Sequence, residues 1–238
     1  MASSTTPVDK KQMVTEMFDN ISKRYDLLNH LLSLNIDKIW RKKAIQSLKP
    51  IAPKNILDVA TGTGDLAIAA MKLQPDKIIG VDISRGMLEK GKIKMLQKGL
   101  DKKIDLFYGD SEKLPFENNS FDAVTCAYGV RNFANLEKGL SEMARVLKPG
   151  GRLAILEFSK PTNFIVKQSF QLYFKFLLPT IGKFISKDKK AYTYLPESVA
   201  IFPEGNNFVD ILSQCGFSKS KAQPLSFGIT TLYTAEKE

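Results

Sequence analysis

The sequence predicts an α/β fold with a mostly parallel sheet, and two patterns carry that prediction. An apolar strand, 56–59, runs into a glycine-bearing turn that ends at Asp65, and the apolar helical run 66–70 follows. A second apolar strand, 78–82, lies about twenty residues further on and also ends in an acid. Parallel strands need crossover connections, so this alternation of strand and helix favours a parallel sheet.

The chain is expected to be a single domain with four parts. These are an N-terminal helical cap (12–50), a cofactor-binding core (51–158), a helical insert (159–205) and a C-terminal helix with a hairpin (206–238). Its 238 residues, 43% of them hydrophobic, suffice for one sizeable core. Residues 1–11 are small and polar, and we expect them to fray.

The individual elements follow from hydrophobic periodicity. The expected helices are 14–34, 36–48, 86–98, 136–147 and 207–215. The expected later strands are 105–110, one within 118–126, 152–158, 218–223 and 229–236. The last two are predicted to close the sheet as an antiparallel hairpin, after an insert that breaks the strand–helix alternation.

The turn after the first strand is suited to a nucleoside-carrying cofactor. The pattern Gly-x-Gly-x-x-Ala at 62–67, followed by Asp82, fits a dinucleotide fingerprint. A pyrophosphate at a helix N-terminus would, however, be repelled by the carboxylate of Asp58 on the preceding strand. S-adenosylmethionine has no phosphate, and its ammonium and sulfonium suit an acidic loop. Asp58 and Asp65 therefore favour this methyl donor over a nicotinamide dinucleotide.

The composition limits the partners, metal sites and cellular compartment that we expect for this protein. The net charge of +10 comes from lysines that are spread rather than blocked, and no RNA-binding motif accompanies them, so a nucleic-acid partner is not expected. The two cysteines, Cys126 and Cys215, and the single histidine, His30, offer no metal-ligand spacing. No signal peptide or bilayer-spanning apolar stretch is evident. We expect a reduced, cytoplasmic, metal-free protein.

Several motifs resemble the class I S-adenosylmethionine-dependent methyltransferases, whose fold is Rossmann-like. They are the acidic loop 58–65, Asp82, Gly109-Asp110-Ser111, Phe121-Asp122 and Leu147-Lys148-Pro149-Gly150-Gly151. The resemblance implies that Asp82 accepts hydrogen bonds from the ribose hydroxyls and that Asp110 and Ser111 read the adenine. It also implies that Gly62, Thr63 and Gly64 contact the methionine part. One departure is Ala60, where the loop most often has glycine.

A second set of motifs is similar to the menaquinone and ubiquinone ring C-methyltransferases. The set comprises Phe18-Asp19-Asn20-Ile21-Ser22 with Tyr25-Asp26 and Asn29-His30, Trp40-Arg41, Tyr128-Gly129-Val130-Arg131-Asn132, Glu157-Phe158-Ser159, and Tyr192-x-Tyr194-Leu195 with Ser198. This resemblance covers the chain from about residue 13 to its end. It implies methylation of a prenylated quinol, with S-adenosylhomocysteine as the second product. The stretch 29–41 looks more like the menaquinone branch, which favours demethylmenaquinol over a benzoquinol.

The chemistry of such a reaction suggests catalytic residues. A methyl cation equivalent needs an electron-rich carbon, which a quinol provides once a hydroxyl loses its proton. Arg131 is permanently charged and could hold the phenolate or lower the quinol pKa, and Asn132 and Tyr25 could orient the hydroxyl. Arg131 as a structural ion-pair partner and Tyr25 as a core aromatic are the alternatives.

The insert is rich in aromatic and apolar residues over 164–185. Such a helix must bury its circumference against the body of the protein, a second subunit or lipid. The sequence leaves three roles for this segment: a core or dimer helix, a lid over an apolar substrate, or a helix that contacts the inner face of the membrane. Other readings of the whole chain are a methyltransferase for another small apolar acceptor and a non-catalytic cofactor-binding module.

Overall fold

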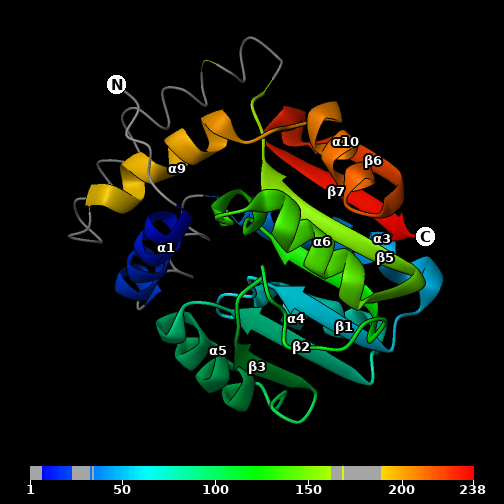
Figure 1. Ribbon diagram of the computed structural model, residues 1–238. Coiled ribbons are helices and arrows are strands. Elements are labelled where there is room, and N and C mark those ends of the chain that lie inside the picture. The colour runs from blue at the N-terminus through cyan, green and yellow to red at the C-terminus, as the bar shows by residue number, and fades with distance from the viewer. Residues whose placement is uncertain (1–6, 23–32, 34, 162–167, 169–188) are drawn as a thin grey trace.

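The protein is described by a computed structural model (Figure 1). The described residues are 7–22, 33, 35–161, 168 and 189–238. They form a seven-stranded sheet in the order β3-β2-β1-β4-β5-β7-β6. The strands are β1 (Asn55–Val59), β2 (Lys77–Asp82), β3 (Ile104–Tyr108), β4 (Phe121–Ala127), β5 (Leu147–Phe158), β6 (Phe217–Leu225) and β7 (Thr230–Lys237).

The pairing confirms a mostly parallel sheet with an antiparallel C-terminal edge. β1 pairs in parallel with β2 and β4, β2 with β3, and β4 with β5. β7 runs antiparallel to both β5 and β6. The chain order therefore reverses between β1 and β4, and ligands of open α/β sheets bind at such a point, beyond the carboxyl ends of the strands.

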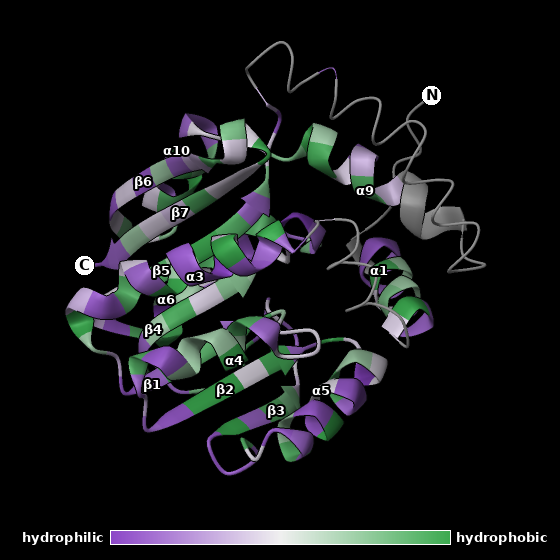
Figure 2. Ribbon diagram, turned by 180° about the vertical axis from the view of Figure 1, so that it is seen from behind, coloured by the Kyte–Doolittle hydropathy of each residue, from purple (hydrophilic) through white to green (hydrophobic). Residues whose placement is uncertain are grey.

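Helices cover both faces of the sheet (Figures 1 and 2). The helices are α1 (Pro7–Ile21), α3 (Ile36–Leu48), α4 (Asp65–Ala70), α5 (Arg85–Gln97), α6 (Leu136–Val146), α9 (Lys189–Ile201) and α10 (Asn206–Gln214). Side chains of α3, α4 and α5 pack in one apolar cluster, and those of α6 and α10 pack in the other. α1 and α9 lie instead beyond the carboxyl ends of the parallel strands.

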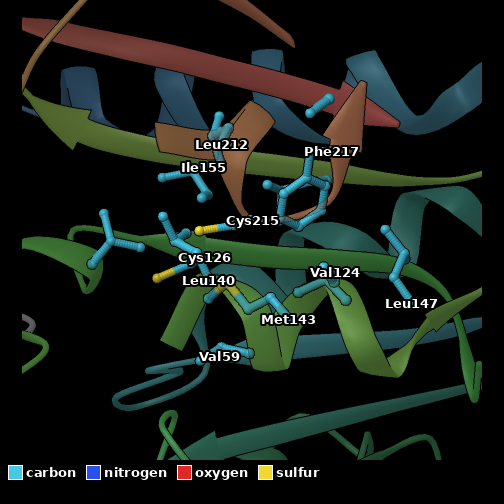
Figure 3. Close-up of a cluster of buried hydrophobic side chains, with 14 of the residues drawn as sticks. Val59, Val124, Cys126, Leu140, Met143, Leu147, Ile155, Leu212, Cys215 and Phe217 are labelled. Carbon is cyan, nitrogen blue, oxygen red and sulfur yellow. The ribbon is translucent and has the colours of Figure 1, made fainter. Parts of the chain in front are cut away.

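The core on the α6 and α10 side contains both cysteines (Figure 3). Cys126 of β4 and Cys215 after α10 are buried free thiols that pack among Leu140, Met143 and Leu212. Burial raises the pKa of the Cys126 thiol well above its usual value. A buried, protonated cysteine behaves as a small apolar residue, so Cys126 contributes packing rather than reactivity.

Three expectations about the elements need comment. The polar segment before residue 12 does not fray throughout, because α1 begins at Pro7 and its lysines reach loops of the sheet. β5 begins at Leu147, so the expected Pro149-Gly150-Gly151 turn belongs to a strand with an irregular register. The apolar run 164–185 and Tyr25 fall outside the described residues.

Candidate active site

A pocket opens where the carboxyl ends of β1 to β4 meet α1. It is open to solvent, and with that solvent included its empty volume is about 710 Å³. Four of the residues expected to bind cofactor line it, together with one expected to be catalytic. They are Gly62, Asp82, Asp110, Ser111 and Asn132.

Asp82 ends β2 and organises the pocket wall. Its two carboxylate oxygens accept hydrogen bonds from Gly62 N at 2.7 Å and Ser84 N at 2.8 Å. Burial raises the pKa of Asp82 to about 6, although these backbone N–H groups oppose the shift. Each oxygen of a carboxylate has two acceptor sites, so both can still accept from a ligand hydroxyl.

Asp110 follows β3 and is held by the N-terminal helix. Lys11 Nζ of α1 lies 2.5 Å from Asp110 Oδ2 and 3.4 Å from a carboxylate oxygen of Glu112. Glu112 in turn accepts hydrogen bonds from Ala134 N and Asn135 N in the loop after β4. Lys11 and the apolar side chain of Phe18 thus complete a wall of the pocket that the sequence did not predict.

Asp58, Thr63 and Gly64 do not line this pocket. Asp58 is 1% exposed, and its carboxylate accepts hydrogen bonds from Thr61 Oγ1 at 2.6 Å and Thr125 Oγ1 at 2.7 Å. Thr63 is buried and accepts from Lys94. The Asp58 carboxylate is therefore turned inward and holds the loop, and its contribution to cofactor binding stays a prediction.

Asp65 has a similar structural role. It lies in the first turn of α4 and forms ion pairs with Arg41 of α3 at 3.3 Å and with Lys94 of α5 at 2.9 Å. A carboxylate in that first turn also suits the helix dipole. Asp65 joins three helices, and it is absent from the lining of the pocket.

Arg131 lies in a 3-10 turn, η4 (Val130–Asn132), just after β4. Its Nη1 donates to Glu157 Oε1 at 2.7 Å and to Tyr128 O at 2.5 Å. The Arg131 side chain is 7% exposed and that of Glu157 is 0% exposed. The ion-pair alternative is therefore realised, but Arg131 Nε is buried without a hydrogen-bond partner in the part of the chain that the structure describes.

The turn that carries Arg131 and Asn132 is shaped by a strained residue. Tyr128 has φ 60°, in the left-handed region that non-glycine residues rarely adopt. Its carbonyl oxygen accepts from Arg131 Nη1 and, at 3.2 Å, from Asn132 Nδ2. Asn132 Oδ1 is a second buried atom for which the described residues supply no partner. Strain of this kind is concentrated at functional sites.

Ala60 and Gly129 pack directly against each other, which predicts opposite effects of two small substitutions. Ala60 has φ 53°, where a side chain costs roughly 1–2 kcal/mol, so we expect Ala60→Gly to leave the Tm unchanged or raise it. A Cβ on Gly129 would lie 2.5 Å from Ala60 Cβ and 2.7 Å from Cys126 Sγ. Gly129→Ala should therefore cost about 1–3 kcal/mol in thermal denaturation.

The double variant A60G/G129A checks this packing. Removing the Ala60 methyl group relieves one of the two clashes made by a Cβ at position 129. The free energy of unfolding of the double variant should therefore be higher than the value obtained by adding the two single-variant changes. Strict additivity would contradict the direct contact.

The described residues contain neither a metal-binding cluster nor a membrane-spanning helix. No group of three or more histidine, cysteine, aspartate or glutamate side chains is placed there to hold a metal ion. Within the same residues, no helix has the length and apolar character needed to cross a membrane.

Solved structures share the fold at low sequence identity. A structure from Thermotoga maritima, described as an S-adenosylmethionine-dependent methyltransferase and possible histamine N-methyltransferase, matches with a TM-score of 0.66 and 18% identity, covering 94% of this chain and 99% of that one. The [4+2]-cyclase SpnF matches with a TM-score of 0.68 and 16% identity, covering 95% and 96%. The fold is therefore that of class I methyltransferases, and it also hosts other chemistry.

Sequence relatives are far more similar. The demethylmenaquinone methyltransferase of Bacteroides fragilis is 52% identical over 229 residues, which is 96% of this chain and 94% of that protein. That of Porphyromonas gingivalis is 44% identical, covering 98% and 97%. A protein of Geotalea daltonii, named ubiquinone/menaquinone biosynthesis C-methyltransferase UbiE, is 44% identical, covering 96% and 98%.

The model of one protein family matches residues 6–237, almost the whole chain. Together with these identities over nearly full length, the match means that this chain belongs to the ubiE/COQ5 methyltransferase family.

Proposed function

We propose that this enzyme transfers a methyl group from S-adenosylmethionine to a ring carbon of demethylmenaquinol, giving menaquinol and S-adenosylhomocysteine. The observation that carries the proposal is that the Asp82 pocket adjoins a buried arginine with an unused donor, in a chain 52% identical to a demethylmenaquinone methyltransferase. A benzoquinol acceptor of the ubiquinone pathway is the alternative, since a relative named for both pathways is 44% identical.

The residues of the pocket fit the cofactor. Asp82 keeps free acceptor sites for a vicinal diol, and Gly62 presents bare backbone beside it. Asp110 is a suitable acceptor for the adenine amine, with Ser111 next to it, and Lys11 already occupies one of its oxygens with a cation. Asp58, Thr63 and Gly64 support the cofactor by holding the shape of the loop.

When bound, S-adenosylmethionine supplies an electrophilic methyl group on a positively charged sulfur. The protein must then make the acceptor carbon electron-rich and hold it in line with that methyl group. Asn132 Oδ1 can accept the hydrogen bond of the quinol hydroxyl, and Arg131 Nε can donate to the same oxygen as charge develops on it. Tyr25 is proposed as a further orienting group.

The ion pair with Glu157 determines how Arg131 can stabilise negative charge on the substrate. The buried carboxylate balances the guanidinium charge, so Arg131 stabilises the phenolate through an aimed N–H rather than as an isolated cation. The hydroxyl proton passes to water, and the resulting phenolate, held by Arg131, pushes electron density onto the neighbouring ring carbon. That carbon would form the new C–C bond as the methyl group leaves sulfur. The proton of that ring carbon then leaves, which restores the aromatic ring.

The apolar side of the substrate is assigned to the insert. A prenyl tail must be kept from water, and the segment 159–205 is rich in apolar and aromatic residues. We propose that this segment covers the tail and meets the inner face of the membrane while the enzyme works from the cytoplasm. A homodimer formed through the same segment is compatible with this arrangement.

Methyl transfer from labelled S-adenosylmethionine tests the function directly. Demethylmenaquinone and the matching benzoquinone precursor are each assayed with and without dithionite. We expect label only in the reduced naphthoquinol, because an oxidised ring is too electron-poor to accept a methyl cation equivalent. Transfer to the oxidised quinone would contradict the phenolate mechanism, and transfer only to the benzoquinol would contradict the choice of acceptor.

A further inference from the structure

Tyr194 of α9 carries a buried hydroxyl for which the described residues supply no hydrogen-bond partner. Besides Ser220 Oγ on β6, the side-chain atoms with this property in the described chain are Arg131 Nε and Asn132 Oδ1. Buried polar atoms are almost always paired, so three unpaired ones at one end of the sheet need an explanation.

The three atoms belong to neighbouring elements. α9 packs against η4, which carries Arg131 and Asn132, and both views place α9 beside α1 beyond the carboxyl ends of the parallel strands (Figures 1 and 2). The charges of Arg131 and Glu157 both act on the Tyr194 hydroxyl. Burial is the main cause that raises the pKa of Tyr194, so the hydroxyl stays protonated and can donate.

The hydrogen-bonding capacities of these atoms match a ring with two oxygens. Arg131 Nε is a donor and Asn132 Oδ1 an acceptor on adjacent residues, and together they satisfy one hydroxyl. Tyr194 is then left over, and a 1,4-quinol has a second oxygen across the ring. Asn132 and Tyr194 come from segments about sixty residues apart, which suits two separate contacts on one ligand.

We propose that Tyr194 is a substrate-contacting residue whose hydroxyl donates a hydrogen bond to the quinol oxygen opposite the one held by Arg131 and Asn132. The inference rests on the proposed function. The opposite oxygen does not ionise in the reaction, so this contact has the same strength before and during methyl transfer. Tyr194 therefore contributes to acceptor binding and not to the chemical step.

The test compares Tyr194→Phe with the wild type on two acceptors. One is a short-chain prenylated 1,4-naphthoquinol, and the other is the matching naphthol that keeps only the hydroxyl beside the methylated carbon. On the quinol we expect KM to rise about tenfold to one-hundredfold while kcat changes less than about threefold. On the naphthol both constants should match the wild type, because the partner oxygen is missing.

Tyr233→Phe is the matched control. Tyr233 is also buried, but its hydroxyl accepts from Gly205 N at 2.9 Å and it belongs to the core between β7 and α10. We expect this variant to lower the Tm and to leave both acceptors' KM unchanged, whereas Tyr194→Phe should leave the Tm of the unliganded protein unchanged or raised. Acceptor binding can also be followed by quenching of Trp40, the single tryptophan, whose ring lies 6.3 Å from that of the pocket residue Tyr128.

The outcomes separate the two ideas. An unchanged quinol KM in Tyr194→Phe, or an equal rise for quinol and naphthol, overturns the role of Tyr194 and leaves the proposed function standing. A wild type that transfers no methyl group to any quinol overturns the proposed function itself, and the inference with it.

Discussion

Replacing Arg131 with leucine is expected to lower kcat by about a hundredfold to a thousandfold, while the affinity for S-adenosylmethionine changes less than about threefold. Arg131 lies just after the strained residue Tyr128, and its buried Nε has no hydrogen-bond partner among the described residues. An N–H aimed at developing negative charge acts in the transition state and contributes little to cofactor binding. Single-turnover rates and calorimetry with S-adenosylhomocysteine measure the two effects separately.

The R131L variant is also expected to destabilise the fold, so a second variant is needed to separate stability from catalysis. Leucine would leave the fully buried Glu157 carboxylate without its cation. We expect this to lower the free energy of unfolding by about 3–5 kcal/mol. The double variant R131L/E157Q removes both charges and should recover much of the lost stability without recovering turnover. If the double variant regained activity, or if R131L weakened cofactor binding as much as turnover, the catalytic role of Arg131 would be refuted.

The sequence predicted the fold because its signals are local. Apolar strands that end in Asp58 and Asp82, helical periodicity between them and glycines at the turns each depend on a few neighbouring residues. The same local patterns placed Asp82 and Asp110 at the carboxyl ends of adjacent parallel strands, and the structure brings both to one pocket.

The contacts within the site depend on tertiary structure, and the sequence could not supply them. The hydrogen bond that Asp58 accepts from Thr125 joins residues more than sixty positions apart in the chain, so the residue type of Asp58 could not predict it. Lys11 stands in a polar segment whose composition predicts a frayed tail, yet its ammonium group forms an ion pair with Asp110 at the pocket. For Glu157 the acid in an otherwise apolar strand end was a usable signal, since a buried carboxylate requires a cation.

Asp82→Asn is expected to weaken S-adenosylhomocysteine binding by about a hundredfold. The asparagine keeps the size of the side chain, but it has one acceptor oxygen for the two backbone groups, Gly62 N and Ser84 N, and for the ribose diol. Hydrogen bonds to a charged acceptor contribute about 1.5–3 kcal/mol each, and this variant loses that charge. Calorimetry measures the change directly.

Asp122→Asn is the matched control for a carboxylate that holds backbone. Asp122 also accepts from two backbone groups, Asn55 N at 2.7 Å and Lys54 N at 2.9 Å, but it lies at the opposite end of the sheet. Losing this carboxylate should lower the Tm and leave cofactor affinity unchanged. A similar loss of affinity in both variants would mean that Asp82 acts only by holding the sheet and its loops.

The pH dependence of binding distinguishes a ligand-binding carboxylate from a structural one. The pKa of Asp82 is about 6 in the folded protein, above the usual 3.8, so the free site takes up a proton as the pH falls through 6. The protonated form binds the diol less well, and wild-type affinity should fall by up to about tenfold per pH unit below 6. Asp19 raises the Asp82 pKa further, and Lys11, Asp110 and Glu112 share the pocket. Burial also raises the pKa of Asp58 to about 6, so this loop carboxylate is the alternative source of the dependence. If Asp82 is the group that titrates, the Asp82→Asn profile should be nearly flat, and a profile as steep as that of the wild type would assign the titration to Asp58 or another group.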